Sequence, residues 1–211
     1  MATIATISSS PSDVSRTEAV LSYVTKRLLS HGHKVTPIVL RDLPAEPLLR
    51  GRADDPGIQT AIDTLAAADA VVVTTPVYKA AYSGLLKVFL DLLPQYALRG
   101  KTVLPLATGG TPAHVLVIDY ALRPVLTSLG AGAIGQGWFV LSSHVRLYDG
   151  GGLLLDPAAS VPLYQVTEAF LSTVAGQPSI ESVPVQAAAL EVVRARPEDP
   201  EAAPSVRTAP S

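Results

Sequence analysis

Short apolar runs alternate with stretches of helical spacing along the first third of the chain. Between the runs, apolar residues recur every three or four positions, which predicts one helix from Ser15 to about Gly32 and another around Ile58 to Leu65. The continuous Val71-Val72-Val73 segment is typical of a parallel strand that is buried on both faces. The predicted strands are Thr3–Ile7, Lys34–Leu40 and Ala70–Thr74.

The same alternation continues in the rest of the chain. A helical segment follows Gly84, and a strand is expected from Thr102 to Ala107. A long helix is then expected to begin with Thr111 as its N-cap and Pro112 as its first residue. The remaining predicted elements are a strand at Ala133–Leu141 and a helix at about Val161–Val174.

This order of elements predicts an α/β protein whose parallel sheet is covered by helices on both faces, through right-handed crossovers. With five strands, the leading arrangement is a flavodoxin-like three-layer sandwich with strand order 2-1-3-4-5. We expect this domain to span residues 1–176. Prolines punctuate residues 177–211, and their composition predicts a partly disordered tail.

The composition removes several classes of function. The chain has 211 residues and no cysteine, which excludes disulfide-stapled domains, cysteine-ligated metal centres and thiol catalysis. A net charge of -2 without a basic cluster argues against nucleic-acid binding. No segment approaches the roughly 20 apolar residues of a spanning helix, and the N-terminus does not resemble a signal peptide, so we expect no membrane association and a cytoplasmic protein. The four histidines lack metal-ligand spacing, so no metal site is expected.

Three polar or glycine-rich segments follow the first, third and fourth predicted strands. In a doubly wound sheet such segments meet at the carboxyl edge, where ligands bind. The first segment, Ser8–Ser12 with Ser15, Arg16 and Thr17, combines hydroxyls, backbone N–H groups and a helix N-terminus, which suits a phosphate group. A serine-rich turn alone would be a solvated helix cap, and its place after the first strand is what favours the phosphate site.

The other two segments suit a planar ring. The second, Thr75–Gly84, offers Pro76 and Tyr78 as a flat wall and the N–H groups of Val77 and Tyr78 as donors. The third, Gly109-Gly110-Thr111, permits close approach to the backbone because neither glycine has a side chain. No Gly-x-Gly-x-x-Gly or Walker sequence is present, which disfavours a dinucleotide fingerprint site and an ATPase.

Longer runs of sequence around these segments are more specific than any of the short motifs. They are Thr75–Gly84, Leu90–Pro94, Leu104–Thr111, His114 and Asp119–Leu126. Together they resemble the NADPH-dependent FMN reductases of two-component alkanesulfonate monooxygenase systems, over roughly residues 3 to 170. The resemblance implies a flavodoxin-like fold, hydride transfer from NADPH or NADH to FMN, and delivery of reduced FMN to a separate flavin-dependent monooxygenase.

Carried over by position, the resemblance also implies where FMN would bind. The residues at its phosphate would be Ser10, Ser15, Arg16 and Thr17. The isoalloxazine ring would lie between Thr75, Pro76, Val77 and Tyr78 on one side and Thr108, Gly109, Gly110 and Thr111 on the other.

The first loop departs from the pattern of the resembled family. Ser9-Ser10-Pro11-Ser12 stands where the family usually has Gly-Ser-x-Arg, so a glycine and an arginine are missing. Loss of an arginine contact to phosphate weakens binding by about tenfold to a hundredfold. We therefore expect weak FMN binding unless Arg16 compensates, and weak binding is compatible with an enzyme that releases reduced flavin.

His114 and Tyr120 are the candidate catalytic residues, although hydride transfer to a flavin depends more on the alignment of two rings than on a protein acid. Lys79 would stabilise negative charge on the reduced ring, or would be a solvated lysine at the start of a helix. Pro124 predicts a bend near Tyr120, and the resembled reductases carry a π-bulge at the matching tyrosine.

Two helices carry apolar residues on more than one face. One stripe is enough to cover a sheet, so the second predicts a homo-oligomer that uses these two helices. The resemblance implies a homodimer or homotetramer, and the π-bulge of the resembled reductases suggests that Tyr120 lies at a subunit interface near the flavin edge. The residues of the extra stripes are Leu85, Val88 and Leu92 in the first helix and Leu116, Val117 and Ile118 in the second.

Two other functions stay open. A related reductase of quinones, azo compounds or metal ions would retain FMN through purification, whereas a non-catalytic flavin carrier would bind FMN without rapid reduction by either nicotinamide nucleotide. The preference between NADPH and NADH cannot be read, because the sequence has no dinucleotide fingerprint.

Overall fold

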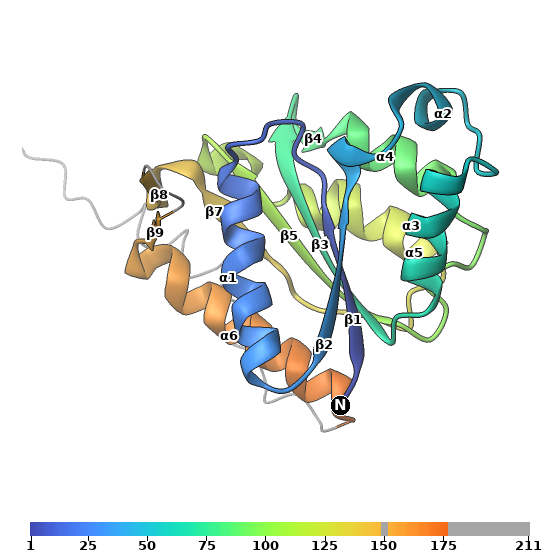
Figure 1. Cartoon of the computed structure of the whole chain (residues 1–211). Helices are drawn as coiled ribbons and strands as arrows, with labels where there is room; N and C mark the ends of the chain where they lie inside the picture. The colour runs from blue at the N-terminus through green and yellow to red at the C-terminus, as the bar shows by residue number, and fades with distance from the viewer. Residues whose placement is uncertain (149–151, 177–211) are drawn as a thin grey trace, which may run out of the picture.

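A computed structural model describes residues 1–148 and 152–176, which include every predicted helix and strand (Figure 1). The predicted tail, residues 177–211, lies outside the described residues. The strands are β1 (Thr3–Ser8), β2 (Lys34–Val39), β3 (Ala70–Tyr78), β4 (Ala81–Tyr82), β5 (Thr102–Gly109), β6 (Ala133–Ile134), β7 (Trp138–Leu141), β8 (Val145–Tyr148) and β9 (Gly152–Leu155). The α-helices are α1 (Arg16–Ser30), α2 (Ala45–Leu49), α3 (Pro56–Ala66), α4 (Gly84–Asp91), α5 (Arg123–Ser128) and α6 (Pro157–Val174).

The main sheet has the expected flavodoxin-like arrangement. Its parallel strands lie in the order β2-β1-β3-β5-β6, with β7 also paired to β5 and the short β4 antiparallel to β3. This order differs in detail from the predicted 2-1-3-4-5, because β4 intervenes along the chain and the last predicted strand is split into β6 and β7. The carboxyl ends of β1, β3 and β5 are therefore neighbours.

The expected strand Ala133–Leu141 is interrupted by Gly135-Gln136-Gly137. Val103 of β5 pairs with Ile134, and Leu106 pairs with Trp138, so two residues of β5 face three residues of the neighbouring segment. Such an extra residue breaks the ladder as a bulge does. Gly137 occupies the left-handed region at φ 74° beside Pro105, which has no N–H to contribute to the ladder.

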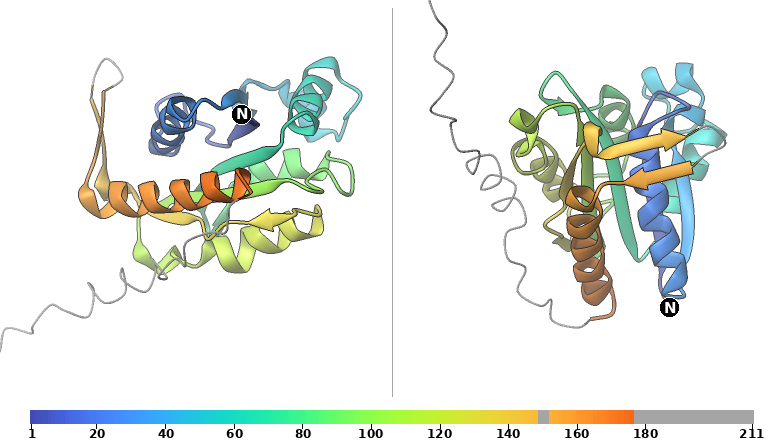
Figure 2. Two further views of the ribbon diagram at one scale, coloured as in Figure 1. Left: turned by 90° about the horizontal axis from the view of Figure 1, so that it is seen from below. Right: turned by 90° about the vertical axis from the view of Figure 1, so that its left-hand side faces the viewer.

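Helices cover both faces of this sheet (Figures 1 and 2). On one face, α1 and α6 lie side by side and bury Val20, Val24, Leu163 and Phe170 against the strands. On the other face, α3, α4 and α5 bury a second cluster that includes Phe89. The hairpin β8–β9, which the sequence did not predict, lies beside α1.

The long helix expected after Thr111 is divided into three kinds of helix. A 3₁₀ turn, η2 (Pro112–His114), comes first, a π-helix, η3 (Ile118–Leu122), follows, and α5 completes it. The N-cap prediction is confirmed, because Thr111 Oγ1 accepts a hydrogen bond of 3.3 Å from the N–H of Ala113. The predicted distortion at Tyr120 is also confirmed and takes the form of the π-helix.

Much of the extra apolar surface is used within the monomer. Leu85, Val88 and Leu92 are half-buried against the core, and Val117 and Ile118 are buried. Leu116 and Tyr120 keep 51% and 54% of their surface exposed, which leaves a smaller apolar surface than the sequence predicted. Among the described residues, no helix has the length and apolarity that crossing a membrane requires.

Candidate active site

The turn between β1 and α1 gathers hydroxyl and backbone N–H groups at a helix N-terminus. Ser8 Oγ, at the end of β1, is buried and has no hydrogen-bond partner among the described residues. Ser15 caps α1 by accepting from the N–H of Glu18 at 3.4 Å. Within the described chain, the N–H groups of Arg16 and Thr17 find no acceptor. Free donors at the positive end of a helix dipole are suited to an anion.

Hydrogen bonds between buried side chains join the first segment to the other two. Thr17 Oγ1 lies 2.5 Å from Thr108 Oγ1 at the end of β5, and both side chains are buried. Ser83 Oγ lies 3.0 Å from the carbonyl oxygen of Ser9 and 3.2 Å from its hydroxyl, and it also caps α4. The three segments singled out in the sequence therefore form one connected site at the carboxyl edge of the sheet.

The strand predicted to end at Thr74 extends into the first half of the second segment. Residues 75–78 continue β3, which turns back through Lys79 and Ala80 into β4. Thr75 and Pro76 are buried, and Thr75 Oγ1 accepts from the N–H of Ser83 at 2.9 Å. The side chain of Thr75 thus holds the hairpin together, while Val77 is half-buried and Tyr78 is half-exposed at the tip.

The hairpin turn stores backbone strain. Lys79 and Ala80 have φ values of 50° and 62°, in a region that favours glycine. A two-residue hairpin loop of type I′ requires a positive φ at both of its residues. The Asn-Gly pair that usually occupies such a loop is absent here. Strained residues of this kind are concentrated at functional sites.

Replacing Ala80 with glycine should therefore stabilise the protein. The left-handed conformation costs alanine about 1–2 kcal/mol, and this strain disappears with glycine. Glycine also stabilises the unfolded chain through its greater conformational entropy, which offsets about half of that gain. We therefore expect the free energy of unfolding to rise by about 0.5–1 kcal/mol. The neighbouring Ala81→Gly, within β4, should instead destabilise by a similar amount. Urea unfolding of both variants checks this, and a loss of stability in Ala80→Gly would contradict the assigned strain.

The two glycines of the third segment have different surroundings. A Cβ on Gly109 would lie 2.7 Å from Phe139 Cζ, so glycine is needed there for packing against Phe139. A Cβ on Gly110 would meet nothing within 4 Å, so Gly110 is the position that leaves the backbone open to a ligand. His114 lies half-buried in η2, and its side chain has no hydrogen bond or ion pair with any described residue.

Tyr120 connects the π-helix to the strained turn. Its hydroxyl donates a hydrogen bond of 2.9 Å to the carbonyl oxygen of Ala80. At the same time, Arg123 anchors the end of η3 to the break between β6 and β7, donating to the carbonyl oxygens of Ile134, Gly135 and Gln136 at 3.1, 3.2 and 3.2 Å. The π-helix thus links the second segment to the edge of the sheet.

Removing only the Tyr120 hydroxyl should loosen the hairpin tip. A hydrogen bond of this kind contributes about 1 kcal/mol, so Tyr120→Phe should lower the free energy of unfolding by up to about 1 kcal/mol and raise the Kd for FMN by up to about fivefold. Titration of flavin fluorescence and thermal unfolding check the two parts. Tyr120→Ala with unchanged flavin reduction, flavin binding and oligomeric state would contradict any functional role of this residue.

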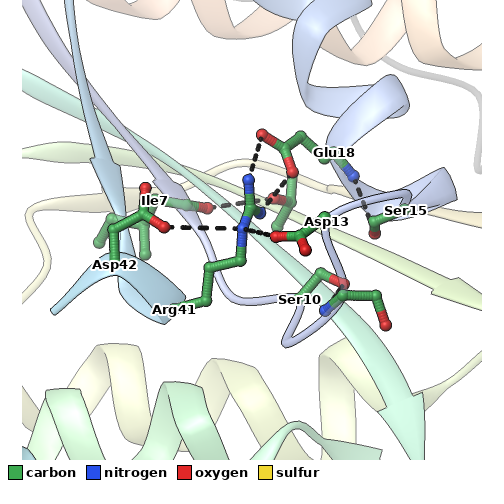
Figure 3. Close-up of polar contacts among 9 residues, drawn as sticks. Ile7, Ser10, Asp13, Ser15, Glu18, Arg41 and Asp42 are labelled. Carbon is green, nitrogen blue, oxygen red and sulfur yellow. Dashed lines mark hydrogen bonds and ion pairs between the residues drawn. The ribbon is translucent and has the colours of Figure 1, made fainter. Parts of the chain in front are cut away.

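A cluster of charged side chains that the sequence did not indicate borders the first segment (Figure 3). Arg41, in the 3₁₀ turn η1 (Leu40–Asp42), donates through Nη1 and Nη2 to Glu18 at 2.5 and 3.3 Å. Its Nε lies 3.2 Å from an oxygen of Asp13 and 3.7 Å from one of Asp42. The hydrogen bond that Arg41 donates to Glu18 raises the pKa of Arg41 above its usual value. Nothing local in the sequence marked Arg41, because it follows β2 and reaches the loop only through the fold.

Arg16 lies on the same turn but is directed elsewhere. Its Nε donates to the carbonyl oxygen of Val145 at 3.2 Å, which fixes part of the guanidinium against β8. The hydroxyls and free N–H groups of this turn fit the phosphate of FMN, and the open backbone at Gly110 fits a planar ring. The described residues contain no group of three or more His, Cys, Asp or Glu side chains placed to hold a metal ion.

Comparison with known proteins connects this geometry to a family. The family profile described as NADPH-dependent FMN reductase matches residues 2–145. An FMN reductase (NADPH) of Escherichia coli (strain K12) is 48% identical over 145 residues, 69% of this chain and 76% of that protein. A second one, from Pseudomonas putida, is 46% identical over 147 residues, 70% of this chain and 75% of that protein. The crystal structure of an NADH:FMN oxidoreductase (EMOB) in its apo form superimposes with a TM-score of 0.74 and 38% identity, over 86% of this chain and 92% of that one.

Proposed function

This chain belongs to the NADPH-dependent FMN reductase family, and we propose that, as an NAD(P)H:FMN oxidoreductase, it releases reduced FMN to a separate flavin-dependent monooxygenase. The observation that carries the site assignment is the pair of side-chain contacts that join the three segments, Thr17 with Thr108 and Ser83 with Ser9. The chemistry that FMN supplies is acceptance of a hydride from the reduced nicotinamide.

We assign the chain's own contribution to positioning. The N–H groups of Arg16 and Thr17, with the hydroxyls around them, would hold the phosphate end of the flavin. The β3–β4 hairpin tip at Val77 and Tyr78 and the open backbone at Gly110 would flank the ring. Within this proposal no side chain has to move a proton during hydride transfer, so His114 would serve near the site without being essential.

The first test measures NADPH oxidation by the purified protein with and without added FMN. We expect oxidation that depends on FMN and a protein that loses its flavin during purification. A protein that stays yellow and follows ping-pong kinetics would instead support the reductase that retains FMN. Binding of FMN without oxidation of NADPH or NADH above the rate without protein would support the flavin carrier.

The role of the partner needs its own test. We propose, from the resemblance of the sequence, that the monooxygenase acts on an alkanesulfonate. Mixing the protein with such a monooxygenase, FMN, NADPH, oxygen and a sulfonate should release sulfite. Omitting the reductase should abolish the release, and sulfite formation that is no faster with the protein than without it would contradict the proposed role.

The exposed part of the second apolar stripe supports a homo-oligomer. Leu116 is 51% exposed next to Tyr120, and burying both in a partner copy would remove apolar surface from water. Leu116→Glu should therefore shift the protein to a monomer in size-exclusion chromatography with light scattering. Leu49→Glu on α2, where the leucine is 74% exposed, is the matched control and should leave the assembly intact. A wild-type protein that is already monomeric would contradict this part of the proposal.

A further inference from the structure

Ser15 and Glu18 have the spacing of a capping box at the start of α1, but only half of the box is formed. In a complete box the N-cap hydroxyl accepts from the N–H of the third helical residue, whose side chain accepts in turn from the N–H of the N-cap. The first bond is present, from the N–H of Glu18 to Ser15 Oγ at 3.4 Å. Among residues 1–148 and 152–176, no group accepts from the N–H of Ser15. The helix N-terminus therefore keeps N–H groups that its own glutamate could bind.

Arg41 holds the carboxylate of Glu18 away from these N–H groups. Its Nη1 donates to Oε2 at 2.5 Å and its Nη2 donates to Oε1 at 3.3 Å, so both oxygens of Glu18 are engaged. Figure 3 shows the Glu18 carboxylate directed towards Arg41, on the side away from Ser15. The side chains of Arg41 and Glu18 are only 19% and 34% exposed, so water and salt screen this pair less than a pair on an open surface.

The register of the sheet places Arg41 where it can do this. Val39, the last residue of β2, pairs with Ser8, the last residue of β1, so the chain after β2 begins beside the turn after β1. Leu40 is buried and fixes the 3₁₀ turn that carries Arg41. The Nε of Arg41 lies 3.2 Å from Asp13 in the turn itself. Arg41 therefore connects the turn and the first helical residues from outside both.

A carboxylate and a phosphate would compete for the same helix N-terminus. An exposed helix N-terminus favours an anion by about two- to fivefold, and a glutamate three residues after the N-cap is well placed to be that anion. With its partner removed, Glu18 can close the capping box onto Ser15. Its charge at about 5 Å would also disfavour a second anion by about fourfold for each unit of charge, even in water.

We propose that Arg41 is a positioning residue for FMN binding, which acts through Glu18 by keeping this carboxylate out of the phosphate site at the start of α1. The inference rests on the proposed function, because it concerns the phosphate end of that same site. Arg41 does not have to touch FMN, since two of its nitrogens bind Glu18 and the third faces Asp13. The N–H groups of Arg16 and Thr17 stay available to the phosphate.

The test is a cycle of variants at these two positions. We expect Arg41→Gln to raise the Kd and the KM for FMN by about tenfold and to leave kcat at saturating FMN unchanged. Adding Glu18→Gln to that variant removes the competing charge, so the Kd should return to within about twofold of the wild-type value. Glu18→Gln alone should bind FMN at least as tightly as the wild type.

Arg50→Gln is the matched control. It removes an arginine that pairs with Glu46 four residues earlier, where both side chains are at least 70% exposed and far from this turn in the sequence. This variant should change neither the Kd nor the KM for FMN. Titration of oxidised FMN without NADPH, followed by flavin fluorescence, gives the Kd values independently of turnover.

The outcomes separate the possible roles of Arg41. A Kd for Arg41→Gln within twofold of the wild type would overturn the inference. A double variant that binds as weakly as Arg41→Gln would also overturn it, because Arg41 would then bind the phosphate itself or serve only the structure of the turn. General damage to the fold would lower kcat too, and removing the second half of the ion pair would not repair it. A wild-type protein that reduces no FMN would overturn the proposed function itself.

Discussion

Gly137→Ala should lower the free energy of unfolding by about 3–5 kcal/mol, through left-handed strain and overlap with a neighbouring strand. Gly137 has φ 74°, and a Cβ there would lie 2.3 Å from the carbonyl oxygen of Pro105 and 3.0 Å from its Cγ. The overlap with the oxygen involves backbone, and β5 is paired with β3 on its other side, so Pro105 cannot move away. Urea denaturation followed by circular dichroism measures the loss.

The control separates the conformational cost from the overlap. Gly100 has nearly the same φ, 75°, but a Cβ there would meet nothing within 4 Å. Gly100→Ala should therefore cost only the left-handed penalty of about 1–2 kcal/mol. If both alanine variants lost the same stability, the close approach of Gly137 to β5 would not be the reason for glycine at that position.

The break at Gly137 also shows what the sequence could predict about the fold. The alternation of apolar runs and helical spacing was enough for the parallel sheet and for the neighbouring carboxyl ends of β1, β3 and β5. Predicting the position of the bulge requires the register between β5 and the Gly135-Gln136-Gly137 segment. That register is set by pairing between residues that are distant in the sequence. Gly135 and Gly137 inside the predicted strand indicate that a bulge could form there, but they do not give its register against β5.

The β3–β4 hairpin could not be predicted for a related reason. Pro76 argues against continuing a strand, and Lys79-Ala80 is not a usual hairpin turn. The strand continues because Thr75 is fixed by the N–H of Ser83 and because Tyr120 holds the turn. These contacts come from other elements, so local propensity does not include them.

The candidate site also has a part that the sequence could predict and a part that it could not. The segments around Thr17, Thr108 and Gly110 were predictable, since topology alone places the ends of β1 and β5 at one edge. Their hydrogen bonds were not, and Arg41 was missed because its position beside Asp13 depends on the turn after β2. The sequence showed that the loop lacks an arginine, but it did not show that Arg41 lies beside the loop in contact with three carboxylates.

Thr17→Val should lower stability by about 1–3 kcal/mol, because it leaves a buried hydroxyl without a partner. The two hydroxyls of Thr17 and Thr108 lie 2.5 Å apart, and the side chains are 3% and 5% exposed. Valine has nearly the same shape, so the loss reports the hydrogen bond rather than a cavity. Thr108→Val should cost a similar amount for the same reason, and thermal or urea unfolding measures both.

The double variant then separates the support of the site from contact with flavin. When both hydroxyls are removed, no buried hydroxyl is left without a partner. The double variant should therefore be destabilised much less than the sum of the two single variants, with a coupling energy of about 0.5–3 kcal/mol. Losses that simply add would contradict the bond between the two threonines. If Thr17 also donates to the flavin, the Kd for FMN should stay about fivefold weaker in the refolded double variant. A Kd that recovers together with stability would show that the pair only holds α1 against β5, and the phosphate end would then rest on the backbone N–H groups and Ser10.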